Sequence, residues 1–391
     1  MNKLKELYLR LCMTALFSEV VKKPIFTFFE KLVTEERKEE KIKAYAAMVG
    51  EIYRSRLSLS ELVKKYIFED ENVYIKSAAH KLSVSESVKF SLESELSALS
   101  EFASLTKADF AEAIGVSNLS PFESEATDII TEYRERVKNV EKHGYGIFSS
   151  RPMFRLSEGG VIEPILSADK TTVDKFVGYE EERTAVLRNT EAFVEGRPAA
   201  NTLLCGDAGT GKSSTVKAIA NLFFDRGVRL IELRKDQLKM LPEVMGKISE
   251  NPLKFIIFID DLAFNKSDDN FSMLKAALEG SASAKADNAV IYATSNRRHI
   301  IKESFADRDS GDDVHRNDTM QEMLSLSERF GLVVLFSKPN KQLYLEIVHT
   351  LAERFEVEMP QERLDVLAEA FALKRGSRSA RCAEQFIESL L

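Results

Sequence analysis

The stretch from Gly206 to Ser213 reads GDAGTGKS and matches every fixed position of the pattern GxxxxGK[S/T]. The apolar run NTLLC precedes it, and the amphipathic helical pattern SSTVKAIANLFF follows. Glycines let backbone N–H groups turn towards phosphate oxygens, and the helix N-terminus adds the positive end of its dipole. The stretch therefore predicts a strand, a phosphate-binding loop and a helix. We expect the Lys212 ammonium on the β- and γ-phosphates of a nucleotide and the Ser213 hydroxyl on Mg²⁺.

A second candidate segment is the apolar run FIIFI, which ends in two acids, Asp260 and Asp261. In a nucleotide-binding sheet, an acidic strand beside the phosphate loop ends where Mg²⁺ is held. We expect the Asp260 carboxylate to contact the metal, directly or through water. The Asp261 carboxylate is expected to polarise the attacking water as a general base.

Around these segments, apolar runs alternate with helical patterns from Phe176 to Pro339. Five runs have the character of buried strands: NTLLCG, VRLIEL, KFIIFID, NAVIYATS and LVVLFSKP. Strands separated by helices are typical of a parallel sheet covered on both faces. The pattern predicts an α/β domain with a parallel five-stranded sheet over residues 176–339. Only helical patterns follow, which predicts a helical domain over residues 340–391.

The first part of the chain has a different character. Residues 1–142 show apolar side chains at three- and four-residue spacing, which predicts a mostly α-helical N-terminal domain. Gly, Pro and Ser become frequent in residues 143–175, and the helical periodicity stops. We expect a linker there, with short strand-like pieces.

Composition narrows the class of protein. A chain of 391 residues is long enough for two or three domains. The net charge of −7 argues against indiscriminate binding to nucleic acid. Cys12, Cys205 and Cys382 are too few and too widely spaced for a disulfide framework or a zinc site, which favours the reducing cytoplasm. We expect neither a signal peptide nor a membrane span, because no apolar stretch approaches about 20 residues.

Six features in the expected order make the chain resemble an AAA+ ATPase, a P-loop NTPase with a C-terminal helical lid. They are Phe176-Val177-Gly178-Tyr179, the phosphate loop, the Asp260-Asp261 strand, Asn296 after NAVIYATS, Arg329 in LSLSERFG, and Arg381 in SARCAEQF. More narrowly, residues 143–391 resemble an uncharacterised prokaryotic AAA+ family classed as a domain of unknown function. Runs such as GDxGTGKSS, FIxFxDDLxF and LSLSxRFG have counterparts there.

The resemblance implies a role for each feature. Residues 176–179 would line the adenine pocket, and Asn296 would orient the lytic water as sensor 1, on a strand between the other two. Arg329 would be an arginine finger acting on ATP in the neighbouring subunit, which implies a homo-oligomer. Arg381 would be the sensor-2 arginine of the lid, with Arg378 as the competing candidate.

The predicted site residues have three roles. ATP would be bound by Val177, Gly178, Gly206, Asp207, Ala208, Gly209, Thr210, Gly211, Lys212, Ser213 and Ser214. Mg²⁺ would be bound by Ser213 and Asp260. The catalytic residues would be Lys212, Asp261, Asn296, Arg329 and Arg381.

Two features depart from the resemblance. Many AAA+ proteins have Glu where this chain has Asp261, and the shorter side chain leaves slow hydrolysis open. Asn265–Asp268 spells NKSD, a guanine-recognition pattern. It follows the acidic strand directly, whereas GTPases place it at the end of a later strand, and Ala263 stands where their DxxG switch needs Gly. We therefore interpret NKSD as a loop and helix cap.

Three functions remain open from the sequence. The first is an oligomeric, Mg²⁺-dependent ATPase that acts on a macromolecular client through the helical N-terminal domain; a protein client is slightly favoured, and nucleic acid is not excluded. The second is a nucleotide-gated scaffold with little hydrolysis. The third is a DNA-associated loader that resembles the replication-initiator AAA+ proteins. The basic cluster Arg297–His299 leaves three readings open: a subunit contact, a nucleic-acid contact or a solvated turn.

Overall fold

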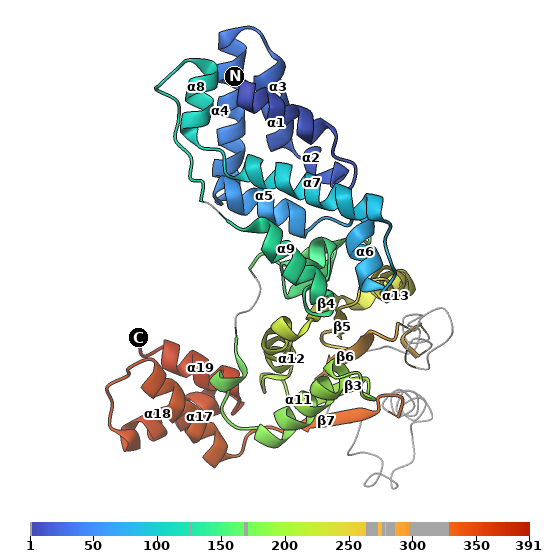
Figure 1. Ribbon diagram of the computed structural model, residues 1–391. Helices are drawn as coiled ribbons and strands as arrows, with labels where there is room; N and C mark the ends of the chain where they lie inside the picture. The colour runs from blue at the N-terminus through green and yellow to red at the C-terminus, as the bar shows by residue number, and fades with distance from the viewer. Residues whose placement is uncertain are drawn as a thin grey trace. The chain divides into compact units, whose positions relative to one another are not determined.

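The computed structural model describes residues 2–125, 127–167, 171–262, 273–275, 278, 286–296 and 328–391. The chain divides into two compact units, Met1–Ser150 and Arg151–Leu391 (Figure 1). The NKSD run at 265–268 and the basic cluster at 297–299 lie outside the described residues. Among the described residues, no helix is both long and apolar enough to cross a membrane.

The first unit is helical, which confirms the expectation for this part of the chain. Its helices are α1 (Asn2–Cys12), α2 (Ser18–Val21), α3 (Pro24–Thr34), α4 (Lys38–Ser55), α5 (Leu59–Phe68), α6 (Val73–Ala79), α7 (Glu86–Ala103), α8 (Lys107–Ile114), α9 (Ile129–Lys138) and α10 (Val140–His143), followed by the 3₁₀ turn η1 (Gly146–Ser149).

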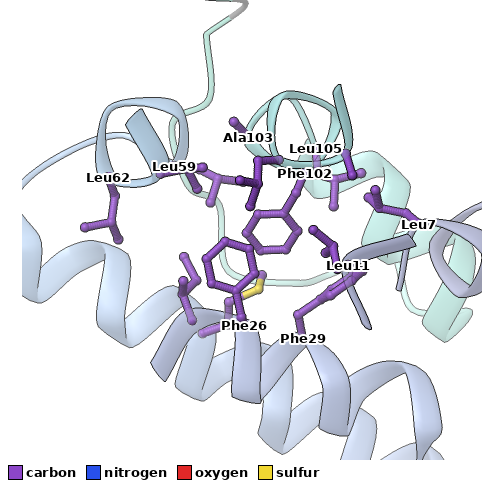
Figure 2. Packing of buried hydrophobic residues seen from close by; sticks show 14 of the residues in the cluster. Leu7, Leu11, Phe26, Phe29, Leu59, Leu62, Phe102, Ala103 and Leu105 are labelled. Carbon is purple, nitrogen blue, oxygen red and sulfur yellow. The ribbon is translucent and has the colours of Figure 1, made fainter. Parts of the chain in front are cut away.

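Phenylalanine rings fill the centre of this unit. Phe26 and Phe29 of α3 meet Phe102 of α7 with ring centroids 4.6 and 4.9 Å apart (Figure 2). Leu7 and Leu11 of α1 close the same cluster, and all five side chains are at most 5% exposed. Burial of large apolar side chains is the main favourable term in folding, so this cluster holds α1, α3 and α7 together.

A buried carboxylate fixes one turn of the first unit. Glu95 of α7 is 6% exposed and accepts hydrogen bonds of 2.9 to 3.1 Å from the backbone N–H groups of Ala15, Leu16 and Phe17. These amides precede α2 and have no partner within a helix. The turn between α1 and α2 is therefore tied to α7 through one side chain.

The second unit contains a seven-stranded sheet in the order β2-β1-β4-β5-β6-β3-β7. Its strands are β1 (Met153–Leu156), β2 (Ile162–Pro164), β3 (Thr202–Gly206), β4 (Val228–Leu233), β5 (Lys254–Ile259), β6 (Ala289–Ser295) and β7 (Leu332–Phe336). All pairs are parallel except β1 with β2.

The prediction of a five-stranded sheet is wrong by two strands. The five predicted strands are β3 to β7, and the additional β1 and β2 come from the segment predicted as a linker with short strand-like pieces. Met153, Phe154 and Leu156 are at most 3% exposed, so this segment is part of the core. The strands are only four and three residues long, too short for a clear alternating pattern in the sequence.

Helices surround the sheet and continue after it. They are η2 (Val173–Lys175), α11 (Glu180–Val194), α12 (Lys212–Leu222), η3 (Phe224–Arg226), η4 (Lys235–Met240), α13 (Leu241–Ser249), α17 (Lys341–Arg354), α18 (Gln361–Arg375) and α19 (Ala380–Glu388). The last three, α17, α18 and α19, pack against one another (Figure 1). Their apolar core includes Tyr344, Val348, Ala383 and Phe386. The predicted α/β architecture with a C-terminal helical lid is confirmed.

Candidate nucleotide-binding site

Three neighbouring strands bring the predicted site segments together. Strand β6 is hydrogen-bonded to β5 on one side and β3 on the other, and all three run in the same direction. Their carboxyl ends therefore meet, which is where open α/β sheets bind ligands. A cavity of about 620 Å³ lies at this end, lined by residues that include Ala208 to Ser214, Asp260, Asp261 and Asn296.

The phosphate loop turns sharply as it leaves β3. Gly206 has a φ of 132°, and a Cβ atom added there would lie 2.0 Å from the Phe336 carbonyl oxygen. The Asp207 N–H donates to that same oxygen at 3.1 Å, so the loop is anchored on β7. Gly209 and Gly211 also have positive φ values, of 76° and 88°. Only glycine meets these requirements without strain.

The Lys212 side chain lies inside the loop and is 5% exposed. Its ammonium donates to the carbonyl oxygens of Gly206 at 3.2 Å and Asp207 at 2.6 Å, and to Asn296 Oδ1 at 3.0 Å. Burial lowers the pKa of Lys212, and the nearest carboxylates oppose that shift only in part. A nearby anion, such as a phosphate group, would stabilise the charged form of this buried ammonium.

The two acids are held by different donors. The Ser213 hydroxyl donates to Asp260 Oδ1 at 2.6 Å, and the Asn296 amide donates to Asp261 Oδ1 at 2.8 Å. Because Asn296 Oδ1 also accepts from Lys212, one amide side chain joins the phosphate-loop lysine to the second acid. The structure thus brings together five residues singled out in the sequence.

The sequence prediction missed Thr294, which lies two residues before Asn296 and lines the cavity. Its hydroxyl donates to Asp260 Oδ1 at 2.5 Å and accepts from the Asp261 N–H at 2.9 Å. The available signal was a threonine near the end of NAVIYATS, the buried strand next to the one that ends in Asp260 and Asp261. The sequence resemblance assigns the polar role on this strand to Asn296 alone.

The far end of the cavity is lined by the segment ahead of α11. Phe176, Val177 and Tyr179 line the cavity from this segment, and Ile347 and Leu351 line it from lid helix α17. The Tyr179 hydroxyl donates to the Ser337 carbonyl at 2.6 Å. Apolar walls of this kind suit the face of a base.

Gly178 does not line the cavity but determines how closely the lid approaches. Its φ is 72°, and an added Cβ would lie 2.4 Å from Leu343 Cδ1 of α17. The next residue towards the N-terminus, Val177, packs against the apolar core of the lid. Glycine is therefore needed where the segment predicted to line the adenine pocket crosses α17.

The two candidate arginines of the lid have different surroundings. Arg381 lines the cavity, and its backbone N–H donates to the Gly209 carbonyl at 3.3 Å. Arg378 is not part of the lining; its guanidinium makes a bidentate pair with Glu369 at 2.9 and 2.6 Å. Arg378 thus ties α18 to the start of α19, while Arg381 reaches the phosphate loop.

Arg329 lies at the opposite end of the sheet from the cavity. It precedes β7, whose first residue Leu332 pairs with Thr202 at the start of β3. The loop leaves the other end of that pair, at Gly206 and Phe336. Five strand residues at about 3.3 Å each separate the two ends by roughly 16 Å. Arg329 is not brought to the site of its own chain.

Residues 149–391 match the model of a family described as a protein of unknown function, DUF815. The chain belongs to this family. The phosphate loop, the acidic strand and the position of β6 between β5 and β3 agree with the resemblance of the sequence to AAA+ ATPases. The first unit lies almost entirely outside the matched region. No curated protein matches this DUF815 chain in sequence.

Two proteins are among the solved structures that the chain matches. The Holliday junction branch migration motor RuvB of Thermotoga maritima matches 56% of this chain and 71% of its own, with 14% identity and a TM-score of 0.32. The replication initiator DnaA, bound to AMPPCP and single-stranded DNA, matches 56% and 64%, with 19% identity and a TM-score of 0.41. Similarity at this level says nothing about a shared activity.

Proposed function

We propose that this DUF815 protein binds ATP with Mg²⁺ and hydrolyses it. The observation that carries the proposal is the hydrogen-bonded set at the strand ends, in which Asn296 joins Lys212 to Asp261 and Ser213 contacts Asp260. Each of these groups has a distinct use in phosphoryl transfer to water. A site that only binds phosphate has no need for a second carboxylate, Asp261, connected to Lys212 through Asn296.

The residues present fit a nucleotide and its metal ion. The loop glycines leave room for backbone N–H groups around phosphate oxygens, and the buried ammonium of Lys212 lies among them. The Ser213 hydroxyl and the Asp260 carboxylate supply the oxygen ligands that Mg²⁺ prefers. When bound, Mg²⁺ would offset the negative charge of the β- and γ-phosphates.

The side chains divide the work of hydrolysis. We infer that the Asp261 carboxylate accepts a proton from the attacking water, and that the Asn296 amide keeps this carboxylate aimed at the reacting phosphate. Arg381 would stabilise charge on the phosphates from the lid side, because its backbone is bonded to the loop. The short Asp261 side chain reaches less far than Glu, so we expect slow turnover.

We further propose that the site works at a subunit boundary. Arg329 lies at the amino ends of the strands, so it would serve the ATP of a neighbouring copy rather than its own. In this proposal residues 176–339 form the nucleotide-binding domain, residues 340–391 the lid, and the helical residues 1–142 an adaptor. A protein client for the adaptor is slightly favoured over nucleic acid.

A phosphate-release assay tests the proposal. Wild type should release phosphate from ATP in a Mg²⁺-dependent manner, and Lys212→Ala should lower the rate by at least about 10²-fold. Asp261→Asn keeps the shape of the acid and should bind ATP with little turnover. Tight ATP binding by wild type without phosphate release would instead support the nucleotide-gated scaffold. Preference for GTP in a competition assay would contradict the assignment of ATP.

A further inference from the structure

The turn after β5 has an unusual backbone. Asp261 has a φ of 53°, in the left-handed region that few residues other than glycine adopt. This turn ends the strand and points the Asp261 carboxylate at the Asn296 amide. Continued extended backbone would send successive side chains to opposite faces of the sheet. The conformation of this one residue therefore decides where the second acid lies.

Three hydrogen bonds from Thr294 hold the turn. The Thr294 hydroxyl accepts from the Asp261 N–H at 2.9 Å, and the Thr294 carbonyl accepts from the Leu262 N–H at 2.6 Å. The same hydroxyl donates its proton to Asp260 Oδ1 at 2.5 Å. A hydroxyl has one proton to donate and two lone pairs to accept with, so both side-chain contacts are made at once.

The environment makes these contacts strong. Thr294 is 2% exposed, so water does not compete for its hydroxyl. Asp260 Oδ1 also accepts from the Ser213 hydroxyl at 2.6 Å and the Asp261 N–H at 3.1 Å. Three donors on one oxygen keep the carboxylate from rotating.

We propose that Thr294 is the positioning residue that sets both acids of the site, Asp260 through its hydroxyl proton and Asp261 through the left-handed turn. This inference rests on the proposed function, and one of its readouts, the Asp261 φ, does not depend on hydrolysis. The methyl group of Thr294 is not needed in this role, whereas the hydroxyl is. Thr294 touches neither phosphate nor water in the proposal and acts only through the two aspartates.

The experiment compares three variants of the full chain. Thr294→Val removes the hydroxyl and keeps the shape, and Thr294→Ser keeps the hydroxyl and removes the methyl. Thr190→Val is the matched control, because the Thr190 hydroxyl is equally buried and bonded to Tyr292 away from the cavity. The readouts are kcat and KM for ATP, ATP affinity with and without Mg²⁺, and the Asp261 φ in crystals of both Thr294 variants.

Thr294→Val should lower kcat by about 10²-fold, the loss typical of a misplaced general base, while ATP affinity without Mg²⁺ stays within about twofold. The gain in ATP affinity on adding Mg²⁺ should shrink, and Asp261 should leave the left-handed region. Thr294→Ser should restore kcat to within about threefold and keep the turn, because it retains the hydroxyl.

The proposal is overturned if Asp261 keeps its φ in Thr294→Val crystals. It is also overturned if Thr294→Ser is as impaired as Thr294→Val, or if Thr190→Val loses as much kcat as Thr294→Val. A wild type that releases no phosphate would contradict the proposed hydrolysis, and the Asp261 φ in the two Thr294 variants would still decide the role of Thr294.

Discussion

At the scale of single residues, Asn296 is the link between the lysine and the second acid. Replacing it with Ala removes both of its contacts, so Asp261 loses its donor and Lys212 one acceptor. We predict a fall in kcat of about 10²-fold with little change in KM, because the phosphate loop itself is intact. Asn139→Ala in the first unit is the control. A rise in KM at constant kcat would contradict the prediction.

Asp70 gives the first unit a stability that depends on pH. Asp70 is 8% exposed, and burial raises the pKa of its carboxyl, with Glu19 and Glu71 adding to the shift. The folded state therefore binds more protons than the unfolded state just above pH 3.8, and stability falls as pH rises through the folded pKa.

We predict that Asp70→Asn raises the free energy of unfolding at pH 7, because the wild-type carboxyl must ionise in a buried place and the amide does not. The difference in stability between Asp70→Asn and wild type should vanish at a pH well below 3.8, where Asp70 is neutral in both the folded and the unfolded state. Urea unfolding followed by circular dichroism at both ends of this range is the measurement. Glu36→Gln on the surface is the control, and an equal gain at both pH values would refute the mechanism.

At the scale of elements, the turn between α1 and α2 depends on Glu95. Glu95→Ala leaves three backbone N–H groups without their acceptor, and the one on Phe17 is buried. We predict a loss of about 1 to 3 kcal/mol in unfolding free energy, as expected when a buried donor loses its partner. Glu93→Ala, one half of an exposed ion pair on the same helix, should cost less than about 1 kcal/mol. Similar losses for the two variants would contradict this assignment.

The two arginines of the lid, Arg381 and Arg378, should respond differently to substitution. Arg381→Ala should reduce ATP turnover by about 10- to 100-fold, because Arg381 lines the cavity next to the phosphate loop. Arg378→Ala should leave kcat within about threefold of wild type, since its guanidinium pairs with Glu369 rather than facing the cavity. The reverse order of effects would reassign the sensor-2 role to Arg378.

At the scale of the whole molecule, the proposed boundary site can be tested by mixing. Lys212→Ala subunits lack a working phosphate loop but carry Arg329. Arg329→Ala subunits carry a working phosphate loop but lack the arginine. An equimolar mixture should recover about a quarter of the wild-type rate, because one boundary in four joins an intact loop to an intact arginine in a symmetric assembly.

Two controls make the mixing experiment decisive. Each variant alone should be nearly inactive, by about 10³-fold or more for the arginine. Lys212→Ala mixed with the double variant should stay inactive, because no boundary then carries both groups. Recovery in that control, or none in the first mixture, would argue against a site shared between copies.

The sequence by itself determined the α/β class, the order of the site segments and the family. These depend on local information, because a phosphate loop needs glycines at particular positions and buried strands need continuous apolar runs. Local pattern also predicts Lys212, Asp260 and Asn296 as site residues, because each stands at the end of an apolar run or inside the phosphate loop.

Only the tertiary structure decided three further points. Strand β1 joins the sheet by pairing with β4, which lies more than 70 residues later in the chain, and β2 joins it by pairing with β1. Pairing between such distant segments is not visible in a local sequence pattern. Arg381 rather than Arg378 faces the cavity because Glu369, on another helix, binds Arg378. The contacts of Thr294 appear only when β5 and β6 lie side by side, since hydrogen bonds between strands depend on register and not on spacing along the chain.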